Sequence, residues 1–270
     1  MNAATTAPRG VHFGLGGRVV VVTGGAQGIG QACARRLARD GAAVAIWDLA
    51  DVAGQALADE LQGQGAQALY CHCNVASRAE VDAALAATLA HFGHVDGLVN
   101  NAGIYKAANF LDITEADWDS VIQVNLKGSF LVGQAVAREM LKNGGPNKGA
   151  IVNMSLVNGT LAIASIASYN ASKGAINQLT RVMALSFADQ GIRVNAVAPG
   201  TIATELARTA VLTSEEAKAR IMSRTPMKRL GEPAEIADVV AWLLSEAASY
   251  VTGEIVVADG GRMTLNYTVP

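Results

Sequence analysis

The stretch VVVVTGGAQGIG, residues 19–30, decides the fold of the chain. Four β-branched residues in succession predict a buried strand, and the glycines after them permit a tight turn that a pyrophosphate can approach closely. A helix that starts after such a turn presents free N–H groups and a positive dipole end. The stretch therefore predicts a phosphate-binding turn formed by Gly24, Gln27, Gly28, Ile29 and Gly30. Taken alone, it is also compatible with an ordinary strand-to-helix turn.

Outward from this stretch, apolar β-branched runs alternate with segments of helical period. We predict strands at 19–22, 43–47, 66–71, 95–99, 150–154, 194–197 and 254–258, and helices at 29–39, 52–62, 79–92, 118–140, 172–188, 213–223 and 233–245. Alternation of this kind implies parallel βαβ units with right-handed crossovers. The expected fold is therefore an α/β Rossmann-like, doubly wound parallel sheet of about seven strands with helices on both faces. Ligands of such sheets bind at the carboxyl ends of the strands.

No repeat or linker divides the chain, so we expect one domain over residues 17–270, preceded by a flexible arm at 1–16. The arm lacks the apolar core of a signal peptide, and no apolar run approaches the ~18 residues of a membrane span. The chain has 21 basic and 23 acidic residues, a net charge of −2 and no basic block. Composition therefore indicates neither nucleic acid nor a membrane as a partner.

Cysteine and histidine patterns indicate neither a disulfide framework nor a metal site. The three cysteines, Cys33, Cys71 and Cys73, are odd in number and lack zinc-ligand spacing. We interpret them as reduced thiols of a cytoplasmic protein. The four histidines are scattered without partner carboxylates at ligand spacing, so no metal is expected.

An acidic residue ends the second predicted strand. Asp48 lies eighteen residues past Gly30. A carboxylate at this place accepts both hydrogen bonds from an adenosine ribose diol and repels a 2′-phosphate. Asp48 therefore predicts NAD as the cofactor, the alternative being a solvated strand end.

Five motifs in order resemble the signatures of the short-chain dehydrogenase/reductase family. They are Thr23 to Gly30, Asn100 to Gly103, Asn125 in Val124-Asn125-Leu126, Tyr169 to Lys173, and Pro199-Gly200 with Ile202 and Thr204. The resemblance runs from about Gly17 to Gly261. It implies an oxidoreductase that transfers a hydride between NAD(H) and a secondary alcohol or ketone. Members of the family are commonly homotetramers.

The resemblance assigns roles to the residues of these motifs. Tyr169 and Lys173 are four apart and share one helix face. A tyrosine titrates near ~10, and a neighbouring ammonium lowers its pKa, so Tyr169 is expected to be the acid/base. Lys173 would also hold the nicotinamide ribose, and Asn125 a water that relays protons. An isolated Tyr-x-x-x-Lys is also compatible with a surface pair.

The remaining cofactor contacts follow from the same resemblance. Asn101, Ala102 and Gly103 would line the adenosine ribose and the central crevice. Asn74-Val75 stands where the family commonly has Asp-Val against the adenine, and the side-chain oxygen of Asn74 can still accept. Pro199, Gly200, Ile202 and Thr204 would form the loop on the nicotinamide side.

One position departs from the family pattern. The serine that holds the substrate oxygen usually stands 13 residues before the tyrosine, where this chain has Leu156. Ser155 is one position early, and a shift of one along an extended segment turns a side chain to the other face. Either the donor is missing, or Ser155 supplies it after a local rearrangement, or Leu156 shapes an apolar pocket.

The expected substrate pocket is mainly apolar. It is bordered by Tyr105, Leu156 to Ile163 and the segment Ile202 to Ser223, with Asn158 and Thr160 as polar exceptions. This suits a medium-sized alcohol, ketone or sugar-like polyol. Because of Leu156, a second function stays open: an NAD-binding sensor or structural protein, or a catalytically impaired variant of the family.

Overall fold

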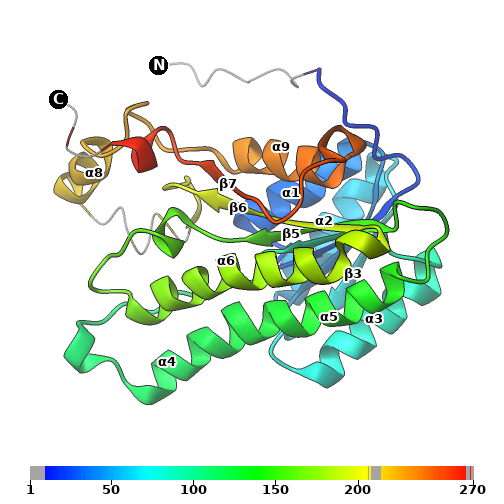
Figure 1. The fold of residues 1–270 in the computed structure, drawn as a ribbon, viewed down its shortest axis with the longest axis horizontal. Coiled ribbons are helices and arrows are strands. Elements are labelled where there is room, and N and C mark those ends of the chain that lie inside the picture. Colours follow the sequence, from blue (N-terminus) through cyan, green and yellow to red (C-terminus); the bar gives the residue numbers. More distant parts are fainter. Residues whose placement is uncertain (1–9, 206, 208–213, 266–267, 269–270) are drawn as a thin grey trace.

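A seven-stranded parallel sheet forms the centre of the molecule (Figure 1). The computed structural model describes residues 10–205, 207, 214–265 and 268. The strand order is β3-β2-β1-β4-β5-β6-β7, which confirms the doubly wound sheet predicted from the alternating pattern. The strands are β1 (Val19–Thr23), β2 (Ala43–Asp48), β3 (Ala68–His72), β4 (Gly97–Asn100), β5 (Gly149–Met154), β6 (Ile192–Pro199) and β7 (Ile255–Ala258).

Helices cover both faces of the sheet. They are α1 (Gly28–Arg39), α2 (Asp51–Gly63), α3 (Arg78–Phe92), α4 (Glu115–Val121), α5 (Ser129–Met140), α6 (Ala167–Phe187), α8 (Glu215–Met222) and α9 (Pro233–Leu244). Successive strand residues point to opposite faces. Val20 and Val22 therefore pack against α1, α2 and α9, whereas Val19 and Val21 pack on the side of α3, α5 and α6.

Local sequence signals set several helix ends. Ser77 caps α3 by accepting a hydrogen bond from the backbone N–H of Glu80, and Gly93 ends the helix in a left-handed conformation. Before α9, Glu232 and Glu235 form a capping box around Pro233. These short-range preferences agree with the long-range apolar pattern, so element order is well specified by the sequence.

The chain switches direction across the sheet between β1 and β4. It moves outward from β1 through β2 to β3, returns to β4, and then moves outward again to β7. A crevice opens at the carboxyl ends of the strands at such a switch point. Gly24 follows β1 and Asn101 follows β4, so the two glycine-containing turns meet there.

The predicted long helix at 118–140 is interrupted. A π-helical turn over Ile122–Gly128 separates α4 from α5 and has Asn125 near its centre. The apolar period of the sequence continues through this turn, which is why one uninterrupted helix was the wrong prediction. Turns of this kind often occur at functional sites.

Residues 10–16, which belong to the expected flexible arm, contact the folded domain. Leu15 is fully buried, and the backbone N–H of Phe13 donates to Asp40 at 3.2 Å. The guanidinium of Arg36 lies 5.2 Å from the centre of the Phe13 ring. An apolar anchor and a cation–π contact therefore attach this segment to α1. Residues 1–9 lie outside the described residues.

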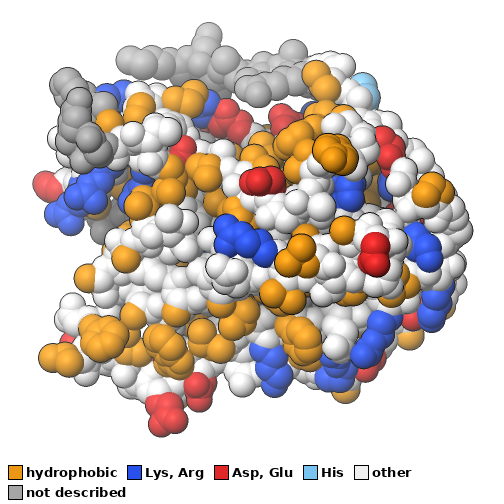
Figure 2. All heavy atoms as spheres, in the orientation of Figure 1, with side chains coloured by type: hydrophobic (Ala, Val, Ile, Leu, Met, Phe, Trp, Pro, Cys, Tyr) orange, Lys and Arg blue, Asp and Glu red, His pale blue; other side chains and the backbone are white. Residues whose placement is uncertain are grey.

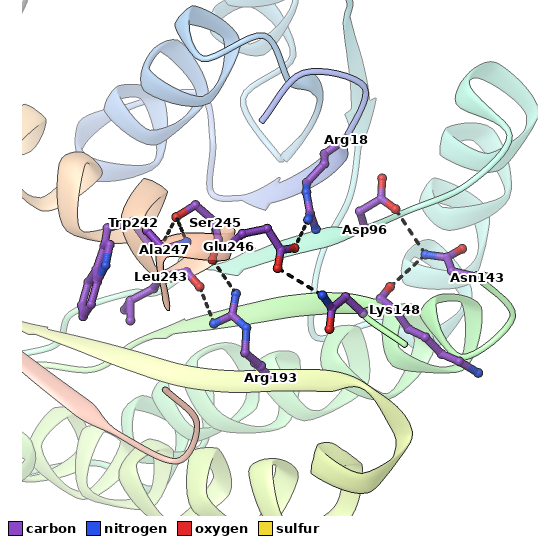
Figure 3. A network of polar contacts seen from close by, with 11 residues as sticks. Arg18, Asp96, Asn143, Lys148, Arg193, Trp242, Leu243, Ser245, Glu246 and Ala247 are labelled. Carbon is purple, nitrogen blue, oxygen red and sulfur yellow. Dashed lines mark hydrogen bonds and ion pairs between the residues drawn. The ribbon is translucent and has the colours of Figure 1, made fainter. Parts of the chain in front are cut away.

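A polar network ties together the amino ends of the strands (Figure 3). Asp96 accepts from the backbone N–H of Val19 at 2.8 Å, and Arg193 donates to the carbonyl oxygens of Leu243 at 2.8 Å and Ser245 at 3.0 Å. Glu246 accepts from Arg18 in the same network. Most of these partners are backbone groups or paired charges, so this edge holds the fold together and leaves the carboxyl edge for ligands.

The described part of the chain contains neither a membrane-spanning helix nor a cluster of metal-binding side chains. None of its helices is long and apolar enough to cross a membrane. Nor does it contain a group of three or more histidine, cysteine, aspartate or glutamate side chains placed to hold a metal ion.

Candidate active site

The turn after β1 has the shape that a pyrophosphate requires. Gly24 and Gly28 adopt φ angles of 60° and 56°, which residues other than glycine rarely adopt. A Cβ at Gly30 would lie 2.0 Å from the carbonyl oxygen of Gly24, so only glycine allows α1 to start this close to the turn. No side chain caps the N-terminus of α1 within the described residues. Its first N–H groups, around Ile29, therefore suit an anion.

Hydrogen bonds fix this turn to the neighbouring one after β4. The Thr23 hydroxyl accepts from the backbone N–H groups of Asn101 at 3.0 Å and Ala102 at 3.1 Å. The side-chain amide of Asn101 donates to the carbonyl oxygens of Thr23 and Gly24, each at 3.0 Å. Asn101 therefore shapes the phosphate turn from the side, in addition to the ribose-lining role expected for it.

Asp48 ends β2 beside the phosphate turn. Its carboxylate accepts from the backbone N–H of Ala26 at 2.9 Å and from that of Ala50 at 3.0 Å. These bonds hold the carboxylate at the place where an adenosine ribose would lie, and each oxygen keeps a free lone pair.

The residues expected against the adenine lie at the end of β3. The side-chain oxygen of Asn74 accepts from the backbone N–H of Ala76 at 3.0 Å, which forms a local turn. Val75 is buried, and a Cβ at Gly128 would lie 2.7 Å from its side chain. This pair is therefore rigidly placed, although part of the acceptor capacity of Asn74 is already used.

The loop expected on the nicotinamide side closes over the crevice. Pro199 ends β6, and the backbone N–H of Gly200 donates to Ala258 at 3.0 Å. Ile202 pairs with Gly231 in a short parallel bridge. A Cβ at Gly28 would lie 3.5 Å from the methyl group of Thr204, so this loop reaches the phosphate turn. The loop therefore lies beside the phosphate turn, and Gly103, after β4, lies against the Asn125 side chain.

Tyr169 and Lys173 occupy the first turns of α6. The helix starts at Ala167, five residues earlier than predicted, so Tyr169 is itself helical. The Lys173 ammonium lies 5.5 Å from the centre of the Tyr169 ring and donates to the Met154 carbonyl at 2.7 Å. The helical spacing therefore does bring the two side chains together.

Burial decides the ionisation of this pair. It raises the pKa of Tyr169 to about 12, and the nearby phenolic oxygen of Tyr105 adds to the rise. It also lowers the pKa of Lys173 to about 8. The expected lowering of the Tyr169 pKa is therefore not produced by Lys173 alone, because desolvation outweighs the attraction of the ammonium. Additional positive charge, such as that of an oxidised nicotinamide, is needed to reverse it.

Asn125 connects the π-helical turn to both neighbouring segments. Its side-chain oxygen accepts from the backbone N–H of Ile104 at 2.8 Å, and its amide donates to the Ile104 carbonyl at 3.1 Å. The same amide lies 3.2 Å from the Ser172 hydroxyl on α6. Asn125 therefore fixes the positions of these segments, while the water relay expected for it stays a prediction.

The segment after β5 separates Ser155 from the site. The Ser155 hydroxyl donates to the side-chain oxygen of Asn177 at 2.5 Å and is buried. The next residue, Leu156, is half-buried and has an extended backbone. Asn158 is only 6% exposed, and its side chain forms no hydrogen bond within the described residues. In this arrangement Ser155 supports α6, which argues against its expected catalytic role.

Sequence reasoning missed two residues that position the site, Ser172 and Asn177, and it named a third, Tyr105, only as a border of the substrate pocket. Ser172, three residues after Tyr169, donates to the Tyr169 carbonyl at 2.7 Å. Asn177 holds Ser155, and Tyr105 contacts the Tyr169 ring edge-on with 5.5 Å between ring centres. Helical spacing from Tyr169 was a usable signal for Ser172 only, because the other two contacts join distant segments.

Comparisons with known proteins show the family of the chain. A family model described as Enoyl-(Acyl carrier protein) reductase matches residues 24–263. Glucose 1-dehydrogenase 2 from Bacillus subtilis (strain 168) is 39% identical over 256 residues, covering 93% of this chain and 96% of that protein. The 5-keto-D-gluconate 5-reductase of Escherichia coli (strain K12) is 36% identical over 251 residues, and the match covers 93% of this chain and 97% of that protein.

A solved structure has a similar overall fold. A gluconate 5-dehydrogenase from Burkholderia cenocepacia J2315, in complex with NADP and tartrate, has a TM-score of 0.89 and 37% sequence identity to this chain. It covers 94% of this chain and 98% of its own. The matches span nearly the whole sequence, and the chain belongs to the short-chain dehydrogenase/reductase family.

Proposed function

We propose that the protein transfers a hydride between NAD(H) and a secondary alcohol or ketone, with Tyr169 as the acid/base. The observation that carries this proposal is the placement of Tyr169 and Lys173 on one face of α6. The Lys173 ammonium lies 5.5 Å from the centre of the Tyr169 ring. The pair lies at the carboxyl edge of the sheet, where the phosphate turn and the closing loop also meet. Initial rates of NADH oxidation with cyclohexanone and with 5-keto-D-gluconate test the proposal.

The residues of the chain supply the proton and the geometry. When bound, the nicotinamide supplies the chemistry of hydride acceptance and donation. In alcohol oxidation the carbinol C–H bond breaks with its electron pair, and the hydroxyl proton passes to the phenolate oxygen of Tyr169. Reduction is the reverse, with Tyr169 returning the proton to the alkoxide. Lys173 stabilises the phenolate by its charge and holds the nicotinamide ribose.

The cofactor is proposed to be NAD, on the support of Asp48. The relative of known structure was solved with NADP, so family membership does not decide this point. Here the carboxylate of Asp48 is held beside the phosphate turn by two backbone N–H groups. A second carboxylate, Asp51, begins α2 next to it. Two negative charges at this place oppose a 2′-phosphate.

The protein is expected to bind NADH more than about tenfold more tightly than NADPH, a difference of ~1.4 kcal/mol. Asp48→Asn removes the charge and keeps an acceptor, so it should narrow this preference. Fluorescence titration of both cofactors on both proteins measures the change, with Asp59→Asn on the outer face of α2 as a matched control. Equal affinities of the parent for NADH and NADPH would show that Asp48 does not select between the two cofactors.

A polyol-like substrate is supported by Asn158. The residue is 6% exposed, its side chain forms no hydrogen bond among the described residues, and its polar atoms still reach solvent, so they can contact a ligand. An amide can both donate to and accept from a substrate hydroxyl. The names of the two enzymes matched above refer to glucose and 5-keto-D-gluconate, which carry several such hydroxyls. The half-buried Leu156 would contact the carbon skeleton.

Leu156 favours a second candidate function, a cofactor-binding protein with little turnover. Without a donor to the developing alkoxide, such a protein binds NADH and leaves ketones unreduced. A binding titration beside the rate assay separates the two functions. Tight NADH binding with no oxidation of NADH by either ketone would favour the second.

A homotetramer in the cytoplasm is also proposed. Apolar side chains lie exposed on successive helices, with Trp118 on α4, Phe130 on α5, and Val182 and Leu185 on α6. Figure 2 shows hydrophobic atoms gathered over α4 and α5. Contiguous exposed apolar surface of this kind supports association between copies. The free cysteines, buried and unpaired with one another, support a reducing compartment.

A further inference from the structure

The site needs a hydrogen-bond donor that neither residue after β5 supplies. The Leu156 side chain has no polar atom, and the Ser155 hydroxyl is engaged with Asn177 at 2.5 Å. A donor aimed at a developing oxyanion is typically worth ~10²–10³ in rate. A competent site therefore requires a donor from another segment of the chain.

Tyr105 is the polar side chain placed directly against Tyr169. The two rings meet edge to face, with 5.5 Å between centres and 74° between planes. Tyr105 is half-buried, and its hydroxyl forms no hydrogen bond within the described residues. The oxygen of Tyr105 also raises the pKa of Tyr169, so the two phenols share one environment.

Hydrogen bonds hold the two tyrosines in fixed relation. The residue before Tyr105, Ile104, has both its backbone N–H and its carbonyl bonded to Asn125. Asn125 in turn bonds to Ser172, and the Ser172 hydroxyl donates to the Tyr169 carbonyl. A donor fixed in this way loses little entropy when the substrate binds.

A second tie joins the loop of Tyr105 to the segment before α6. The backbone N–H of Ala108 donates to the Ser165 carbonyl at 3.0 Å. The loop that carries Tyr105 is therefore attached on both sides of this residue, at Ile104 and at Ala108.

The charges near the two phenols give them different roles. Tyr169 faces the Lys173 ammonium, which favours its phenolate. The cation next to Tyr105, Lys106, pairs instead with Asp117 at 3.2 Å. Burial raises the pKa of Tyr105, so this phenol keeps its proton. A neutral phenol is a hydrogen-bond donor at neutral pH.

We propose that the Tyr105 hydroxyl donates a hydrogen bond to the substrate oxygen, in the place that Leu156 leaves without a donor. This inference rests on the proposed hydride transfer and specifies one contact within it. It predicts that positions 105 and 156 are energetically coupled, because either a phenol at 105 or a hydroxyl at 156 satisfies the same oxygen.

The test compares Tyr105→Phe, Leu156→Ser and the double variant, using NADH oxidation with cyclohexanone and 5-keto-D-gluconate. We expect Tyr105→Phe to lower kcat and kcat/KM together by at least about tenfold, the pattern of a contact made in the transition state. Leu156→Ser should restore at least about tenfold in the Tyr105→Phe background, and clearly less with Tyr105 intact. NADH affinity should stay within a few-fold throughout, which shows that the variants fold. Tyr250→Phe, at a fully exposed tyrosine, is the matched control.

Several results would overturn the inference while leaving the proposed function in place. They are an unchanged rate in Tyr105→Phe, an equal loss in both backgrounds, an equal loss in Tyr250→Phe, or turnover that appears only once Leu156→Ser is made beside an intact Tyr105. If the coupling to Leu156→Ser is found with Asn158→Ala and not with Tyr105→Phe, the donor is Asn158. If no variant oxidises NADH although all bind it, the proposed hydride transfer itself fails.

Discussion

Tyr169→Phe is expected to lower kcat by at least ~10²-fold, because it keeps the ring and removes the only group assigned to the proton. NADH affinity should stay within a few-fold, since the phosphate turn and Asp48 lie on other segments. Steady-state kinetics and fluorescence titration measure the two quantities on the same preparation. A variant that turns over like the parent would show that the assigned mechanism is wrong.

The pH dependence of alcohol oxidation also tests the assignment of Tyr169 as the acid/base. Alcohol oxidation needs the Tyr169 phenolate, and burial holds the pKa of this group at about 12 in the protein alone. The oxidation rate of the parent should therefore rise as the pH rises above neutrality. Ketone reduction uses the protonated phenol and should not show this rise. Tyr169→Phe should abolish the alkaline rise, whereas Tyr250→Phe should retain it.

Lys173→Met is expected to damage both catalysis and cofactor binding. The ammonium is buried, donates to the Met154 carbonyl at 2.7 Å and faces the Tyr169 ring. We expect kcat to fall by ~10²-fold and NADH affinity by roughly tenfold, because one residue serves the phenolate and the ribose. This double loss distinguishes Lys173→Met from Tyr169→Phe, which should affect kcat alone.

The ionisation of Lys173 supplies the control measurement. Burial lowers its pKa to about 8, so the charge is present below that pH and is lost as the pH rises through it. NADH affinity of the parent should weaken over this interval, and that of Lys173→Met should not. Lys142→Met, at an exposed lysine two residues past the end of α5 that pairs with Glu139, should behave as the parent does. An unchanged NADH affinity in Lys173→Met would contradict its assignment to the ribose.

The order of strands and helices was predictable from the sequence because local and long-range patterns agree. The alternation of β-branched runs with helical segments places β1 to β7 correctly, with ends shifted by a few residues. The π-helical turn at Ile122–Gly128 was not predictable in this way. Its apolar residues keep the period of a regular helix, and the contacts that Asn125 makes from this turn, with Ile104 and Ser172, join segments distant in the sequence.

The site was predictable where a motif determines it and not where packing does. Helical spacing was enough to bring Tyr169 and Lys173 together. The contact of Tyr105 with Tyr169 joins two segments that no local pattern relates. The pKa of Tyr169 also differs from expectation, because the depth of burial cannot be obtained from spacing. Similarly, the Ser155 bond to Asn177 depends on how β5 meets α6.

Deuterium transfer tests the central claim most directly. NADH that carries deuterium at both C4 positions of the nicotinamide is incubated with the protein and with cyclohexanone or 5-keto-D-gluconate, and the alcohol product is examined by mass spectrometry. If Tyr169 is the acid/base, the parent should form an alcohol that carries one deuterium on the former carbonyl carbon, and Tyr169→Phe should form it at least ~10²-fold more slowly. Tight binding of NADH by the parent without deuterium in either product, or equal transfer by the two proteins, would contradict it.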